Sequence, residues 1–210
     1  MASAEYEVCY SCHGLREQQE AQVIRQDNVT NARLEFDPGN DSYHPVVAPG
    51  RNPDVSGLEG GYTPSSRILC SHCHGSDSQG SGPGPRGPHG SAYPPILERE
   101  YLLGDDSSES SQSYALCYKC HNRALLLSDM NGFPHRRHVV ELQAPCAVCH
   151  DAHGSRRNSH LINFMTATKS GTTVVESSGS GRRAFEDLGR LQGRCFLSCH
   201  GSDHDPKSYP

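Results

Sequence analysis

Four short runs of this sequence have the pattern Cys-x-x-Cys-His, which places two thiols and an imidazole within five residues. A fifth run has the same residue types, with three positions between its cysteines. Two thiols at this spacing can form thioether bonds to two vinyl groups on one edge of a porphyrin, and the histidine that follows can bind the iron. The five runs are Cys9, Cys12 and His13; Cys70, Cys73 and His74; Cys117, Cys120 and His121; Cys146, Cys149 and His150; and Cys195, Cys199 and His200.

The chain has 10 cysteines, and the five runs use all of them. Zinc knuckles and a disulfide scaffold are the alternative uses for paired cysteines. A zinc site built on Cys-x-x-Cys does not need a histidine directly after every second cysteine, and secreted disulfide frameworks do not gather cysteines into close pairs five times. We therefore predict five covalently attached c-type haems, with thioether bonds from all ten cysteines and the five adjacent histidines as proximal iron ligands.

Eight further histidines are candidates for the second axial position of each iron. Two axial histidines saturate the iron and suit it to electron transfer, whereas an open position suits it to substrate binding. His153 follows His150 by three residues, so the two leave the same side of a short turn and cannot bind opposite faces of one ring. His153 is therefore expected to reach the neighbouring haem, on Cys117 and Cys120. The predicted distal ligands are His44, His89, His138, His153 and His160.

Three other histidines rank lower as ligands. His72 lies inside its own attachment loop, which makes it a poor ligand for its own iron. His135 competes with His138, and we prefer His138 because two valines follow it and can anchor the segment. His204 is the next candidate after the five predicted distal ligands.

The composition limits the core that protein atoms alone can build. Only 34% of the 210 residues are apolar and none is Trp, while Gly and Pro number 21 and 14. A chain this polar is expected to wrap apolar haem plates instead of packing a large core of its own. We predict one pentahaem domain over 1–210, with sub-modules 1–104 (two haems) and 105–210 (three haems). The expected fold is mostly irregular with short α-helices, including one over 114–127, and one candidate β-hairpin, from strands at 172–175 and 182–185.

Charge and hydropathy exclude some partners and indicate a compartment. The formal charge of −5 does not indicate a nucleic-acid-binding face. Apolar runs such as Ala124–Leu127 are far too short to span a membrane. No signal-peptide hydrophobic region stands at the N-terminus. Because haem attachment of this kind takes place outside the cytoplasm, we expect an exported protein, extracellular or periplasmic, whose signal lies upstream of this sequence.

The segments CHDAHG at 149–154, HRRHVV at 135–140 and GPHGSAYPPIL at 87–97 add a resemblance to the five runs. Together they resemble bacterial and archaeal multihaem c-type cytochromes with doubled Cys-x-x-Cys-His motifs, and the likeness covers most of the chain. It implies a multihaem cytochrome c fold organised around a stacked haem chain. Some such proteins polymerise into extracellular cytochrome filaments, or nanowires, in which a distal histidine can come from the next subunit. The run at 195–200 departs from the pattern and leaves the setting of the fifth haem open.

The expected function is long-range electron transfer through closely stacked bis-histidine haems, without enzymatic activity. We expect the chain to polymerise with copies of itself into an extracellular conductive filament that exchanges electrons with redox partner proteins or extracellular acceptors. The alternative is a soluble periplasmic pentahaem shuttle to a terminal reductase, which the sequence does not separate from a filament subunit. A multihaem reductase is a third hypothesis. It is less favoured because the sequence has no Cys-x-x-Cys-Lys run and has ample histidines for the distal positions.

Overall fold

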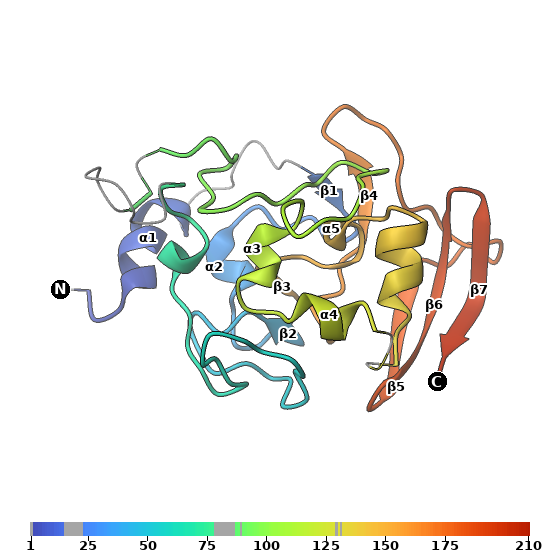
Figure 1. Cartoon of the computed structure of the whole chain (residues 1–210), viewed down its shortest axis with the longest axis horizontal. Helices are drawn as coiled ribbons and strands as arrows, with labels where there is room; N and C mark the ends of the chain where they lie inside the picture. The colour runs from blue at the N-terminus through green and yellow to red at the C-terminus, as the bar shows by residue number, and fades with distance from the viewer. Residues whose placement is uncertain (1, 15–22, 78–86, 89, 129, 131) are drawn as a thin grey trace.

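The elements of the chain lie one after another along its longest axis. The computed structural model describes residues 2–14, 23–77, 87–88, 90–128, 130 and 132–210. Figure 1 shows the N-terminal helix α1 at one end, the sheet β5–β6–β7 at the other, and the short helices between them. The helical elements are α1 (Glu5–His13), α2 (Ala32–Glu35), the 3-10 turn η1 (Cys70–His72), α3 (Ala115–Tyr118), α4 (Arg123–Leu126), the π-helical segment η2 (Arg137–Glu141) and α5 (Cys146–Cys149).

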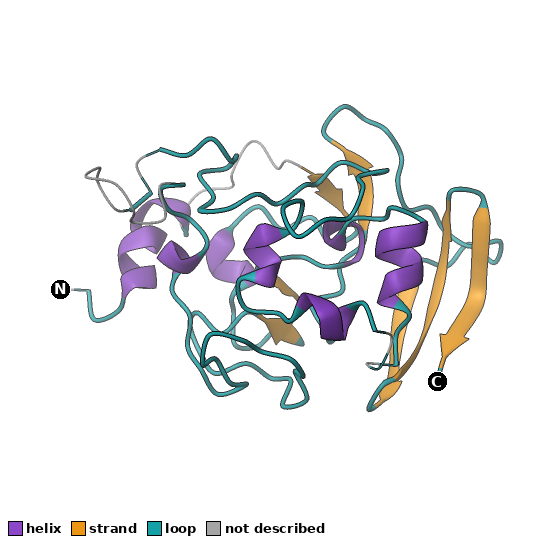
Figure 2. Cartoon of the chain, in the orientation of Figure 1, coloured by secondary structure: helices purple, strands orange, loops and turns teal. Residues whose placement is uncertain are grey.

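Seven strands of the described residues form three antiparallel sheets, which Figure 2 shows in orange. Two sheets are small, and each joins a strand of the first 45 residues to one beyond residue 150. The third is a meander of three sequential strands. The strands are β1 (Val23–Arg25), β2 (Ser42–Tyr43), β3 (Gly154–Ser155), β4 (Met165–Thr168), β5 (Ala184–Gly189), β6 (Gln192–Cys199) and β7 (Ser202–Tyr209). The pairs are β1 with β4, β2 with β3, β5 with β6, and β6 with β7.

An apolar core lies where α5, β4 and the C-terminal meander meet. Its buried residues are Val148, Ile162, Phe164, Met165, Val174, Val175, Phe185 and Leu197. The meander contributes through alternation, because side chains two residues apart on a strand share a face. On β6, Leu197 belongs to the core, and Cys195 and Cys199 pack against it from the same face.

The predicted fold class is wrong in its main feature. We expected a mostly irregular chain with a single candidate hairpin, and the described residues instead contain three antiparallel sheets and a core of protein side chains. Low overall apolar content misled the prediction because burial depends on which apolar residues meet, and not on their share of the chain. Eight apolar residues between 148 and 197 bury one another in one core. Sheets that pair residues more than 100 positions apart also leave no local pattern in the sequence.

Two local predictions need correction as well. The helix expected over 114–127 is broken into α3 and α4, and His121 lies between them in an isolated bridge with Leu58. The strands expected at 172–175 and 182–185 do not pair with each other. Thr173 bridges to Ala167 instead, and the second segment leads into β5, which pairs with β6.

The expectation about membrane spans can be checked directly. Among the described residues, no helix combines the length and the apolar character needed to cross a bilayer.

Candidate functional site: a line of cysteine–histidine clusters

The four Cys-x-x-Cys-His runs all lie in helical turns. Cys9 and Cys12 are on α1, and the other three pairs span η1, α3 and α5 with the residues that end them. Three residues of helix rise only about 4.5 Å, so both thiols of a run stay close together. In three runs the backbone N–H of the histidine donates to the carbonyl of the first cysteine, at 2.8 Å for His74, 3.0 Å for His121 and 2.9 Å for His150. This bond fixes the imidazole directly beyond its two thiols.

The same three histidines are held by one repeated backbone arrangement. Each follows its helical turn directly and forms an isolated antiparallel bridge, His74 with Leu97, His121 with Leu58 and His150 with Ile162. The residue before each bridge partner has a positive φ, and these residues are Ile96 at 62°, Gly57 at 69° and Leu161 at 59°. Left-handed backbone at a non-glycine residue is strained, and such strain persists where the surrounding structure enforces it, often at functional sites.

Each of these three histidines faces a second histidine at nearly the same separation. The ring centres are 6.2 Å apart for His74 and His153, 6.4 Å for His121 and His44, and 6.5 Å for His150 and His135. A fourth pair, His138 and His204, has a separation of 6.4 Å. All eight of these side chains are partly buried, whereas His13, His160 and His200 are exposed.

These separations fit an iron between two imidazoles. A metal-bound imidazole nitrogen lies about 2 Å from the metal and the ring centre about 1.2 Å further, so two rings on opposite sides have centres roughly 6.4 Å apart. Direct ring contacts between aromatic side chains span a wider range of about 4.5–7 Å. The ring-centre separations of the three pairs differ by no more than 0.3 Å, and each pair includes the histidine of a helical Cys-x-x-Cys-His run. The pairs therefore match the donor set that haem iron requires.

Hydrogen bonds occupy the Nδ1 atom in five of the paired rings. The partner is a backbone carbonyl for four of them and the Glu35 carboxylate for His153, at 2.7 Å. A histidine that binds a metal commonly donates its other ring N–H to such an acceptor, which fixes the ring orientation and leaves Nε2 for the metal. The carbonyl partners are Pro95 for His74 at 3.2 Å, Ala152 for His44 at 2.5 Å, His160 for His150 at 2.8 Å and Pro134 for His138 at 3.0 Å.

The small sheet β2–β3 explains how two of the second histidines reach neighbouring clusters. Tyr43 pairs with Gly154, and the backbone N–H of His44 donates to the carbonyl of His153 at 3.0 Å. Gly154 is required there, because a Cβ would lie 2.1 Å from the Glu35 carbonyl oxygen. His44 then faces His121 while His153 faces His74, so one sheet serves two clusters.

The thiols of each run lie near thiols of the next run in the sequence. Cys9 and Cys70 lie within 4.8 Å of each other, together with a Glu5 carboxylate oxygen. Cys117 and Cys146 are hydrogen-bonded, which with burial raises the pKa of the Cys117 thiol. The neighbouring thiols are Cys9 with Cys70, Cys73 with Cys120, Cys117 with Cys146, and Cys149 with Cys195 and Cys199. Each run thus lies near the next, and in Figure 1 α1, α3, α5 and β6 follow in this order along the longest axis.

Burial lowers the pKa of several of the paired imidazoles and so favours the neutral form that binds metal. It lowers the pKa of His121 to about 4, assisted by the nearby rings of His44 and His150. It likewise lowers the pKa of His150 to about 4, with His135 as the next contribution. Burial alone would lower the pKa of His153, but the Glu35 carboxylate raises it above its usual value. Metal binding needs deprotonated ligands. Because the pKa values of His121 and His150 are strongly lowered, protons would compete little with a metal for these two imidazoles near neutral pH.

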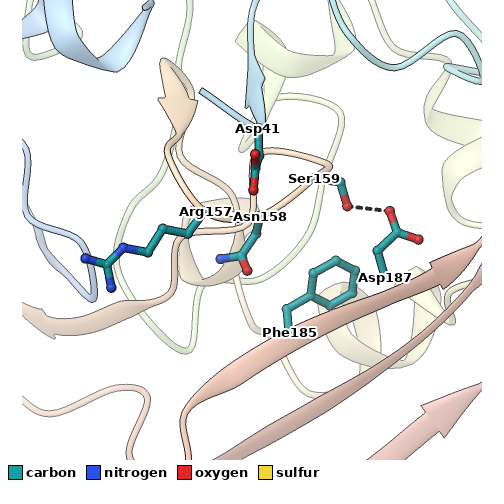
Figure 3. A pocket seen from close by; sticks show the side chains of 6 residues that line it. All are labelled: Asp41, Arg157, Asn158, Ser159, Phe185 and Asp187. Carbon is teal, nitrogen blue, oxygen red and sulfur yellow. Dashed lines mark hydrogen bonds between the residues drawn. The ribbon is translucent and has the colours of Figure 1, made fainter. Parts of the chain in front are cut away.

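The other histidines considered as distal ligands have different surroundings. The Nε2 atom of His160 lies 3.3 Å from the Asp187 carboxylate and its Nδ1 is 3.1 Å from the Asn52 amide, so polar partners occupy both nitrogens. Figure 3 shows the polar pocket beside it, where Ser159 donates to Asp187. His72 packs edge-on against Tyr62. His89 lies outside the described residues.

Two placements differ from what the sequence indicated. His153 faces His74, whereas we expected it to reach the haem on the third run. His135, which we ranked below His138, faces His150, and its ring also contacts Phe133 edge-on. Phe133 stacks on His138 at 4.7 Å as well, and an aromatic residue just before two histidines is the sequence signal that could have marked both as held side chains.

Comparisons with protein-family models, curated proteins and solved structures found no match to this chain.

Proposed function

We propose that this chain is an electron-transfer protein that carries five c-type haems in a line and passes electrons along its long axis. The observation that carries the proposal is the set of three imidazole pairs, 6.2–6.5 Å apart, each built on the histidine of a helical Cys-x-x-Cys-His run. When bound, haem would supply an iron that changes between ferric and ferrous by one electron.

The residues have distinct roles in this proposal. The paired thiols would hold each haem covalently, and the histidine at the end of each helical turn would bind its iron. His153, His44 and His135 would supply the second imidazole at the second, third and fourth runs. An iron with two histidine ligands has no open coordination position, so these three sites favour electron transfer over the reductase hypothesis.

The protein groups around each imidazole tune its donor strength. A carboxylate that accepts the N–H of a ligand imidazole makes it a stronger donor than a carbonyl does and stabilises the oxidised iron. The second site, with Glu35 on His153, is therefore expected to have a lower potential than the fourth, where His150 donates to a backbone carbonyl.

End-to-end assembly with other copies is the expected form of the working protein. The first cluster, on α1, lies at one end of the molecule and the fifth, on the C-terminal meander, at the opposite end (Figure 1). Cys12, His13 and His200 are exposed at these ends. This arrangement supports a conductive filament more than a shuttle, because electrons could enter and leave at opposite ends of each copy. We also propose an extracellular or periplasmic location, because c-type haem is attached outside the cytoplasm.

Protein produced in a host with a c-type haem attachment system tests the proposal. Intact mass is expected to show five haems, and the reduced spectrum the bands of low-spin c-type haem. Electron microscopy at high concentration is expected to show filaments. A colourless product with the mass of the bare polypeptide would refute the electron-transfer proposal, whereas haem-bearing single particles would refute only the filament.

A matched pair of variants tests the role of the paired imidazoles. His44→Ala is expected to convert the iron of the third run to the high-spin ferric form that binds cyanide, and His160→Ala is expected to leave the spectrum unchanged. Equal spectra for both variants would contradict the assignment of His44 as a ligand.

A further inference from the structure

The first cysteines of the first two runs face each other where α1 meets η1. Glu5 and Cys9 are four residues apart on α1, so their side chains lie on one face of the helix. The Glu5 carboxylate accepts from the backbone N–H and from the hydroxyl of Ser71, both at 2.8 Å. Because Ser71 directly follows Cys70, these two bonds turn Cys9 toward Cys70. The two sulfur atoms lie within 4.8 Å of each other and are hydrogen-bonded.

A second pair of first cysteines meets deeper in the molecule. Cys117 on α3 and Cys146 on α5 are hydrogen-bonded through their side chains. Residues close to them in the chain are fully buried: Tyr114, Pro145 and Ala147 are all less than 2% exposed. Close packing on both helical turns therefore holds the two sulfur atoms in place.

Both pairs can close into disulfides with little movement. The S–S bond is about 2.05 Å long, so sulfur atoms within 4.8 Å need to approach by less than about 3 Å, which side-chain rotation can supply. A small disulfide such as oxidised glutathione is a sufficient oxidant. One cysteine thiolate attacks it and releases one glutathione thiol, and the second cysteine attacks the mixed disulfide and releases the other. For each link the two cysteines lose two hydrogen atoms, and the oxidant gains them as two thiols.

We infer that, before haem is attached, an oxidising compartment joins the first cysteines of neighbouring runs in two disulfides, Cys9 to Cys70 and Cys117 to Cys146. These two bonds withhold one thiol from each of the four helical runs. Haem attachment to all four runs therefore needs a thiol reductant first. The cysteines of the fifth run lie on β6 and take no part in the two links. This gate on attachment rests on the proposed function, because it assumes haem, whereas the two disulfides do not.

Full-length chain produced without a haem attachment system tests the two links. The chain is treated with oxidised glutathione, free thiols are alkylated, and peptides are mapped by mass spectrometry without reduction. We expect cross-linked peptides that join residue 9 to 70 and residue 117 to 146, and we expect their loss after reduction. Oxidation in denaturant is expected to favour links within runs instead, because a short loop closes at a lower entropic cost.

Two variants of the third run provide the matched comparison. Cys117→Ser is expected to remove the link to Cys146 and to leave the link between Cys9 and Cys70. Cys120→Ser, which changes the other cysteine of the same run, is expected to leave both links. Links within runs in the folded chain, such as Cys117 to Cys120, would overturn the inference, and so would loss of the link to Cys146 in Cys120→Ser.

Haem counting by intact mass tests the gate. In a host with a haem attachment system, removal of the extracytoplasmic thiol reductant is expected to leave chain without haem on the four helical runs and with both links. A small added thiol is expected to restore haem attachment. Full haem loading without any reductant would overturn the gate. Chain that carries no haem with or without the reductant would refute the proposed function, and the gate with it, while the mapped disulfides would stand.

Discussion

A buried ion pair between Arg25 and Asp151 joins the strand β1 to the segment that carries two of the histidines. Arg25 Nε lies 3.1 Å from Asp151 Oδ2, and the two side chains are only 10% and 11% exposed. Asp151 stands directly after His150 and two residues before His153. Replacing it with Asn is therefore a sharp test of whether this pair stabilises the region between the second and fourth clusters.

The hydrogen bonds of Asp151 set the expected magnitude. Its two oxygens accept from three donors, which are Arg25 Nε, the Asn163 amide at 3.1 Å and the His153 backbone N–H at 3.1 Å. An Asn side chain in either orientation would turn an N–H₂ group toward at least one of these donors. It would also leave the Arg25 charge without its carboxylate, with only the carbonyls of Ala147 and Asn163 as acceptors. We expect Asp151→Asn to lower the free energy of unfolding by about 3 kcal/mol, the lower end of the range for breaking a buried pair.

Urea denaturation of the haem-loaded protein, followed by circular dichroism, measures this change. The matched control is Glu141→Gln, which removes a pair with Arg136 in which both side chains are more than half exposed. The control is expected to change the free energy of unfolding by less than about 0.5 kcal/mol. A change below about 1 kcal/mol for Asp151→Asn would refute the reasoning, because the buried charge would then have lost little by losing its partner.

Three further changes have defined outcomes. Glu109 accepts from Arg123 at 2.6 and 2.8 Å, which lowers the pKa of Glu109 below its usual value, so the pair stabilises the fold above the unfolded-state pKa and is lost as pH falls through the folded one. The difference in unfolding free energy between the unaltered protein and Glu109→Gln should therefore shrink from neutral pH toward roughly pH 3, and a constant difference would contradict this. Glu35→Gln, which weakens the acceptor on His153, is expected to raise the midpoint potential of one haem by on the order of 40 mV in a spectroelectrochemical titration; a lowered potential would contradict it. Asn122→Ala removes the side chain that caps α4 and is expected to lower the unfolding free energy by about 1 kcal/mol in urea denaturation, whereas an unchanged midpoint would show that the cap contributes nothing.

The cysteine runs and their adjacent histidines could be read from the sequence because their spacing is local. A helical turn brings Cys146 and Cys149 together and places His150 beyond them through a bond within the same five residues. The sequence could not pair the second histidines of the second and third runs, because these pairs join residues more than 70 positions apart. His44 reaches His121 and its neighbour His153 reaches His74 only after β2 has paired with β3.

The fold class was mispredicted for a related reason. Average composition describes a whole chain, but burial depends on which apolar residues meet. Phe164 and Phe185 belong to one core because α5, β4 and β5 meet there. No periodicity in the sequence predicts that these elements come together. The short strands β1 to β3 likewise contain two or three residues each and carry no alternation long enough to recognise.

The amino-acid sequence by itself determined the chemistry that this chain offers: ten thiols in five pairs, an imidazole after each pair and eight further imidazoles. The tertiary structure alone decided which imidazole faces which, the order of the clusters along the molecule, and the extended setting of the fifth run. The physical reason is range. A helical turn is specified by bonds between residues three and four apart, whereas a pair of axial ligands requires long-range contacts that exist only once the chain has folded.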